Sequence, residues 1–122
     1  MTFPLATPSL HAAIAALEDR EHRDYVRSEN ALLRDEATQK LSEAGIHVYP
    51  GHGNFILMEM ASPKSLAREM DTALRAEGIS LRRFASPAFD RCLRMTLGRH
   101  SETRTAIDSI IRLYHEKREA RA

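Results

Sequence analysis

Arg94 is the residue of this sequence whose type and position most clearly suggest chemistry. It lies in the middle of CLRMTL (residues 92–97), a short segment in which apolar and polar residues alternate. In a strand, the three apolar residues after Cys92 would share one face and Arg94 would lie on the other. An unpaired buried charge is costly. Two interpretations therefore stay open: Arg94 points into water from an edge strand, or its planar guanidinium binds a carboxylate through two parallel hydrogen bonds.

Two further arginines precede this segment and raise the local positive charge. Arg82 and Arg83 lie in the predicted strand 79–84. Because side chains alternate along a strand, only Arg83 shares the face of the apolar residues Ile79 and Leu81. Arg82 is expected on the opposite face.

The other residue types that carry chemistry form no pattern of this kind. The six histidines are scattered without the spacing of a metal site. Cys92 is the one cysteine, which excludes an internal disulfide and a multi-cysteine zinc site, and we expect it to be a buried, inert thiol. No phosphate-binding glycine loop or serine nucleophile motif occurs. We predict no catalytic residue and no metal ligand in this chain.

Length and composition indicate an ordinary globular protein. The chain has 122 residues, 43% of them hydrophobic, and a net charge of +1. So balanced a charge argues against a nucleic-acid-binding face. The sequence contains no apolar run of the ~18 residues that a membrane span needs, and its first eight residues lack the features of a secretory signal. We expect a cytoplasmic protein that is one domain, residues 1–122, and binds neither nucleic acid nor membrane.

The helices are predicted from apolar residues at helical spacing. Thr7-Pro8 offers an N-cap and a first-turn proline, and the charged run 18–24 predicts a break near Asp19 before a second helix that ends at Gly45. Ser62-Pro63 repeats the start signal for a third helix, which Gly78 ends. A last helix carries its apolar stripe on Ile107, Ile110, Ile111 and Tyr114.

Strands are predicted at residues 46–49, 54–60, 79–84 and 92–97. The order of elements favours an α+β fold, with a small, mainly antiparallel sheet of three or four strands and helices packed on one face. We expect the apolar residues of the last strand (Leu93, Met95 and Leu97) to meet the last helix.

Several of these segments together resemble a known domain. GNFILMEM, SLRRFASPAFDRCLRMTLG and the final amphipathic helix are similar to the C-terminal small domain of class I/II, fold-type I, pyridoxal-phosphate aminotransferases. The nearest resemblance is to the histidinol-phosphate aminotransferase group. FPLATPSLHAAIAAL resembles the segment where the chain of that family leaves its large domain. The resemblance covers about residues 3–115 and implies the fold of the aminotransferase small domain.

The resemblance also implies roles for three residues in substrate binding. Arg94 matches the arginine that binds the substrate α-carboxylate, and Asn54 matches the residue that begins a buried strand near the active-site mouth. Arg82 matches the arginine of a V-R-P motif, which lies near the side chain or phosphate of the substrate. Here Arg83 replaces the proline of that motif, and Ser86-Pro87-Ala88 replaces a Gly-Tyr-Gly-like stretch. These departures leave the substrate open.

The family's large domain supplies the lysine that holds pyridoxal phosphate, and no counterpart is evident here. Lys40, Lys64 and Lys117 lie outside any such motif. The resemblance thus implies a small domain without its cofactor-binding partner, with pyridoxal phosphate in the intact enzyme and none bound by this chain alone. The partners would be the large domain, on which Phe3 and Leu5 would pack, an amino-acid or 2-oxo-acid substrate, and further copies in a homo-oligomer.

Two other functions remain open. One is a pyridoxal-phosphate-dependent decarboxylase of the same superfamily, for which loop 83–88 would differ. The other is a stand-alone, non-catalytic α+β interaction module.

Overall fold

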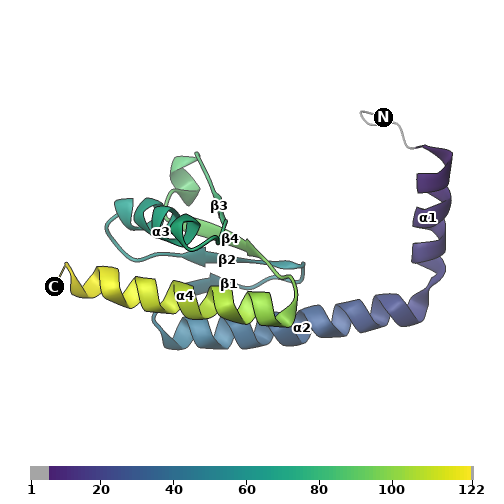
Figure 1. Cartoon of the computed structure of the whole chain (residues 1–122), viewed down its shortest axis with the longest axis horizontal. Helices are drawn as coiled ribbons and strands as arrows, with labels where there is room; N and C mark the ends of the chain where they lie inside the picture. The colour runs from purple at the N-terminus through teal and green to yellow at the C-terminus, as the bar shows by residue number, and fades with distance from the viewer. Residues whose placement is uncertain (1–5, 122) are drawn as a thin grey trace.

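Two helices joined at a sharp break begin the chain (Figure 1). The computed structural model describes residues 6–121. Helix α1 spans Thr7–Glu18 and helix α2 spans Arg20–Glu43. Between them Asp19 leaves the helical region (ψ 84°), and its side chain accepts a hydrogen bond from the backbone N–H of His22 at 3.0 Å. This cap explains the predicted break, because it lets a new helix start in another direction.

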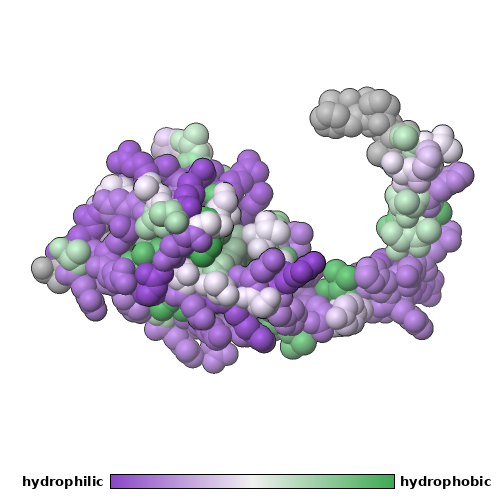
Figure 2. Space-filling model, viewed as in Figure 1, coloured by the Kyte–Doolittle hydropathy of each residue, from purple (hydrophilic) through white to green (hydrophobic). Residues whose placement is uncertain are grey.

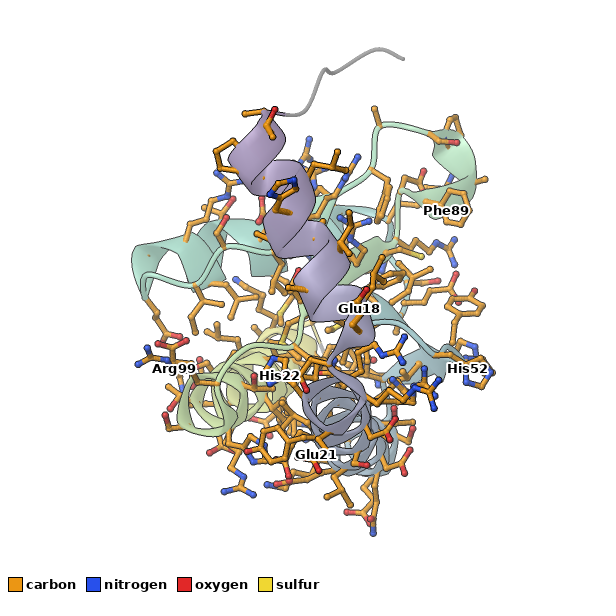
Figure 3. All side chains as sticks on the ribbon, turned by 90° about the vertical axis from the view of Figure 1, so that its right-hand side faces the viewer. Glu18, Glu21, His22, His52, Phe89 and Arg99 are labelled. Atoms are coloured by element: carbon orange, nitrogen blue, oxygen red, sulfur yellow. The ribbon has the colours of Figure 1, made fainter. Side chains whose placement is uncertain are left out.

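A four-stranded antiparallel sheet follows, with the strand order β1-β2-β4-β3. The strands are β1 (His47–Tyr49), β2 (Phe55–Glu59), β3 (Arg82–Arg83) and β4 (Cys92–Thr96), and the remaining helices are α3 (Ser65–Ala76), η1 (Pro87–Phe89, 3-10) and α4 (His100–Glu119). Helices α2, α3 and α4 gather on one side of the sheet, and its other side stays open (Figures 1 and 3). The predicted α+β class is confirmed.

The core lies between the sheet and these three helices. Leu93 and Met95 of β4, together with Leu97, are buried there with Ile107 and Ile110 of α4. The same core includes residues of α2, β2, α3 and α4 and Ile46, which precedes β1: Leu33, Ala37, Leu41, Ile46, Ile56, Met58, Leu66, Met70, Leu74 and Tyr114. The alternation of β4 therefore leaves Arg94 on the open face.

Gly45 and Gly78 end α2 and α3 as predicted. Their φ angles are +90° and +82°, in the left-handed region that residues with a Cβ atom rarely adopt. After Gly78 the backbone N–H of Ile79 bonds the carbonyl of Leu74 at 2.9 Å. Each glycine thus lets the chain leave its helix at once and turn back towards the sheet.

Three details of the sequence prediction are wrong. The strand predicted at 79–84 is reduced to Arg82–Arg83, because the backbone of Ile79 is engaged by the end of α3. Ser62-Pro63 does not start α3, which begins at Ser65 without a side-chain cap. Thr7 is the first residue of α1 and not its cap. The expected contact of Phe3 and Leu5 lies outside the described residues.

An ion pair between Arg104 and Glu36 connects α4 with α2. Arg104 donates from Nε and Nη2 to the two carboxylate oxygens of Glu36, at 3.0 and 3.2 Å, and Lys40 Nζ lies 3.3 Å from the same group. The hydrogen bond from Arg104 is the main cause that lowers the pKa of Glu36 below its ordinary value. The pair is solvent-exposed, so its contribution to stability is small and depends on salt.

This lowered pKa makes the contribution of Glu36 depend on pH. A carboxyl whose pKa is lowered by folding stabilises the protein above its unfolded pKa, and the effect disappears as the pH falls through the folded pKa. We expect Glu36→Gln to lower the urea midpoint at pH 7 and to match the parent at a second, acidic pH below the folded pKa of Glu36, where both side chains are neutral. Glu119→Gln, at the end of α4, is the control and should change neither midpoint. An equal loss for Glu36→Gln at both pH values would contradict the assignment.

Among the described residues, the structure has no helix that is both long and apolar enough to cross a membrane.

Candidate anion-binding face

Arg82 and Arg94 lie directly opposite each other on neighbouring strands. The register of β3 and β4 pairs Arg82 with Arg94, and pairs Arg83 with the buried Leu93. The pairing puts Arg82 and Arg94 side by side on the open face, whereas Arg83 belongs to the other face, as the alternation predicted. Like charges placed directly opposite destabilise a sheet. The pair therefore favours an anion between or beside the two guanidinium groups.

Neither arginine is neutralised within the part of the chain that the structure describes. No ion pair from Arg82 or Arg94 to a carboxylate of residues 6–121 is found. Arg94 is half-buried and Arg82 is exposed. Solvent therefore still reaches both guanidinium groups, and an anion that displaced it could bind either cation.

Aromatic rings support both guanidinium groups. Arg94 Cζ lies 5.1 Å from the centroid of the Phe55 ring, on the adjacent strand β2, and Arg82 Cζ lies 5.6 Å from that of Phe84. Phe84 in turn packs against Phe89, with the two ring centroids 5.7 Å apart. A ring under a guanidinium orients the group and leaves its N–H edge free. Alternation along the predicted strand already placed Phe84 on the face of Arg82, whereas sequence reasoning missed Phe55, because the register that brings it to Arg94 is a property of the folded sheet.

A groove of about 660 Å³ runs past the two arginines. It is lined by the end of α3, by β3 and β4, and by the start of α4, through residues Gly78, Ile79, Ser80, Leu81, Arg82, Arg94, Met95, Thr96, Gly98, Glu102, Thr103, Thr105 and Ala106. Glu102 is the one carboxylate of this lining. Two cations, small hydroxyl groups and a single acid suit the binding of an anionic small molecule, and the lining offers no nucleophile with a base beside it.

Asn54 lies elsewhere. Its backbone carbonyl accepts a hydrogen bond from the N–H of Leu97 at 2.7 Å, which ties the start of β2 to the end of β4. Asn54 lines a second hollow, of about 400 Å³, between α2 and the β1–β2 loop. Of the three residues predicted for substrate binding, the structure thus brings together Arg82 and Arg94 and places Asn54 in a different groove.

We call this second hollow the basic groove. Its lining consists of Ala16, His22, Arg23, Val26, Arg27, Asn30, Arg34, His52, Gly53 and Asn54, without a carboxylate. Arg34 spans the groove and donates from Nη1 to the carbonyl of Gly53 at 2.8 Å. Nothing in the sequence signalled this groove, since its residues come from two helices, α1 and α2, and from a loop that lies further along the chain.

Cys92 is buried, as predicted, and its inertness stays a prediction. It is 2% exposed, and burial is the main cause that raises the pKa of its thiol. A raised thiol pKa disfavours the reactive thiolate. Within residues 6–121, no cluster of three His, Cys, Asp or Glu side chains could hold a metal ion.

The fold and the match to a family model define the class of protein. The model of the aminotransferase class I and II family matches residues 1–110. The chain therefore belongs to the aminotransferase class I and II family, and its structure is that of an aminotransferase domain.

The relatives are histidinol-phosphate aminotransferases. The chain is 36% identical to that of Rhodospirillum rubrum over 109 residues, 88% of this chain and 30% of the relative, and 36% identical to that of Dinoroseobacter shibae over 108 residues, again 88% and 30%. The crystal structure of histidinol-phosphate aminotransferase from Sinorhizobium meliloti, in complex with pyridoxal-5'-phosphate, has the same fold (TM-score 0.78, 24% identity, 86% of this chain and 29% of that one). The chain thus spans about 30% of the length of these curated relatives.

Proposed function

We propose that this chain is the substrate-binding small domain of a pyridoxal-phosphate-dependent aminotransferase of the histidinol-phosphate type. The observation that carries the proposal is the pair formed by Arg82 and Arg94. The two cations face each other across β3 and β4 on the open side of the sheet, without a carboxylate partner among residues 6–121. A sheet gains no stability from such a pair, so binding an anion is the better explanation.

In this proposal Arg94 binds the carboxylate of the amino-acid substrate. Phe55 holds the guanidinium from one side, and the free N–H edge presents the parallel donors that a carboxylate accepts. Arg82, one strand further out, binds a second anionic group of the substrate. Two fixed points orient a small molecule, and orientation is what a binding domain contributes to catalysis on a neighbouring domain.

The residues of this chain do not fit a covalently attached cofactor. Pyridoxal phosphate, which supports amino-group transfer in this family, is held by a lysine. Lys40 pairs with Glu36 at 3.3 Å, Lys64 pairs with Asp90 at 3.5 Å, and Lys117 lies near the end of α4. None of the three lines either groove. The cofactor would therefore be held by the rest of the enzyme, and the chain alone would not catalyse the reaction.

A graft tests the proposed function. In the Rhodospirillum rubrum relative, the matching 30% would be replaced by this chain, and the product assayed for amino transfer between the amino-acid and 2-oxo-acid substrates of that enzyme. We expect transfer that depends on Arg94. A folded graft that releases carbon dioxide instead would indicate the decarboxylase, and a folded graft without either reaction would favour the non-catalytic interaction module.

The isolated chain gives a complementary prediction. After incubation with pyridoxal phosphate and reduction with borohydride, we expect no stoichiometric label on any one lysine, because no lysine lines a groove. Mass spectrometry of the digested chain measures this, and the grafted enzyme, which retains the relative's lysine, is the positive control. Stoichiometric trapping at a single lysine of the isolated chain would contradict the proposal.

A further inference from the structure

The guanidinium of Arg94 rests against an aromatic ring that stays at the surface. Phe55 pairs with Thr96 in the register of β2 and β4, so it is the diagonal neighbour of Arg94 on the open face of the sheet. Arg94 Cζ lies over the ring, 5.1 Å from its centroid. Phe55 is 42% exposed, whereas the surface of the body that Figure 2 shows is mainly hydrophilic. A ring in this position gains little from burial, and it orients the cation above it.

Gly53 provides the space that the ring occupies. A Cβ atom at position 53 would lie 3.0 Å from Cε1 and 3.3 Å from Cδ1 of Phe55, inside van der Waals distance of both. The φ angle of Gly53 is not in the left-handed region, so the backbone conformation itself does not require glycine. The absence of a side chain at this position therefore serves the placement of the Phe55 ring.

The loop that carries Gly53 is held from two sides. Arg34 reaches across the basic groove from α2 and donates from Nη1 to the carbonyl of Gly53 at 2.8 Å, a charge-assisted bond. The carbonyl of the next residue, Asn54, accepts from the N–H of Leu97 at 2.7 Å. Figure 3 looks onto this end of the molecule and shows the loop at His52. The position of Gly53 is thus set by α2 and by the end of β4 together.

These contacts form a continuous series that ends at the anion-binding face. We propose that the ring of Phe55, packed against Gly53, is a positioning device that holds the guanidinium of Arg94 in the orientation that binds the substrate carboxylate. Arg34 contributes by holding the loop. A guanidinium that is oriented in advance loses less conformational freedom when the carboxylate binds. The inference rests on the proposed function for the role of Arg94.

A nuclear magnetic resonance measurement on the full 122-residue chain tests the contact without an activity assay. Protons over an aromatic ring resonate upfield, so the side-chain Nε–H of Arg94 should lie upfield of that of Arg68, an exposed arginine on α3. Phe55→Leu, which keeps an apolar side chain, should remove this difference. Phe55→Tyr, which keeps the ring, should restore it.

Two glycine variants test the space for the ring. Gly51 and Gly53 lie in the same loop, and a Cβ atom at position 51 would meet no atom within 4 Å. Gly53→Val should therefore remove most of the upfield shift of Arg94, whereas Gly51→Val should keep it. In the Phe55→Leu background Gly53→Val should have no further effect, because both changes act through one ring. If Gly53→Val fails to fold, Gly53→Ala repeats the test with a smaller displacement.

The contribution of Arg34 has its own comparison within the basic groove. Arg34→Met removes the hydrogen bond to Gly53 and should reduce the upfield shift of Arg94. Arg27→Met removes another cation from the same groove, leaves this hydrogen bond in place and should not change the shift. Equal reductions in the two variants would assign the effect to the charge of the groove and not to the hydrogen bond.

Steady-state kinetics of the grafted enzyme test the consequence for substrate binding. Phe55→Leu and Gly53→Val should each raise KM for the amino-acid substrate by about two- to fivefold and leave kcat within about twofold. The reason is that Arg94 binds the carboxylate in the ground state and the transition state alike. Phe55→Tyr should return KM to the parent value. A merely structural role would lower the unfolding midpoint without this separation of KM from kcat.

Two results would overturn the inference. One is an Nε–H of Arg94 that is not upfield in the parent chain, and the other is an unchanged KM in both Phe55→Leu and Gly53→Val. Either result would leave the proposed function intact, provided that Arg94→Ala still lowers kcat/KM. An Arg94→Ala graft with unchanged kcat/KM would instead contradict the proposed function, while the upfield shift would still report the contact with Phe55.

Discussion

Arg94→Ala is expected to lower kcat/KM of the grafted enzyme for its amino-acid substrate by about 10- to 150-fold. This range corresponds to about 1.5–3 kcal/mol, the usual scale for a hydrogen bond to a charged group. Arg94→Lys should recover only part of the loss, because an ammonium group cannot form the two parallel bonds of a guanidinium. Steady-state kinetics with the amino-acid concentration varied measures the effect.

The neighbouring arginine is the matched control for this prediction. Arg83 lies on β3 beside β4, as Arg82 does, but its side chain is on the opposite face of the sheet. Arg83→Ala should therefore leave kcat/KM within about twofold of the value for the parent graft. Arg94→Ala should also leave the unfolding midpoint nearly unchanged, because relief from the charge of Arg82 offsets the lost contact with Phe55. A loss of stability that tracks the loss of activity would instead give Arg94 an architectural role.

Leu93→Ala is expected to destabilise the protein by about 2–5 kcal/mol, the range for removing a leucine side chain from a packed core. Leu93 is fully buried in β4, opposite Met58 of β2. Because the total stability of a domain is only about 5–15 kcal/mol, the loss would shift the urea midpoint strongly and would leave part of the protein unfolded. Urea unfolding followed by circular dichroism measures it.

A second leucine provides the comparison. Leu32 is 63% exposed on the solvent side of α2, next to the buried Leu33. Leu32→Ala deletes the same atoms as Leu93→Ala, but from a solvent-exposed side chain. The free energy of unfolding of the isolated chain should therefore fall by less than about 0.5 kcal/mol. Equal losses for the two variants would show that the core is not packed around β4 as described.

Local signals in the sequence predicted the elements well. The charged run near Asp19, the positions of Gly45 and Gly78 and the alternation along residues 92–97 each depend on neighbours within a few residues, and the folded chain follows them. Alternation alone also placed Arg82 and Arg94 each on the face of its strand that is opposite the apolar residues.

Features that depend on pairing between distant segments could not be predicted in this way. The register that sets Arg82 opposite Arg94, the ring of Phe55 beneath Arg94 and the bond from Arg34 to Gly53 all join residues from different elements. The resemblance implied that Asn54 begins a buried strand near the active-site mouth; Asn54 does directly precede β2, and it lines the basic groove. The predicted length of β3 was wrong for a related reason, since the backbone N–H of Ile79 bonds the end of α3 and not a neighbouring strand.

The two central strands of the sheet, β2 and β4, are longer than the two edge strands, β1 and β3. β1 has three residues and β3 has two, so each outer edge offers few free backbone groups to the strand of another molecule. One of the two edge strands, β3, consists of Arg82 and Arg83, and these adjacent positive charges repel the same edge of a second molecule. Charged side chains on an edge strand discourage edge-to-edge pairing, so Arg82 and Arg83 protect the chain from aggregating through this edge.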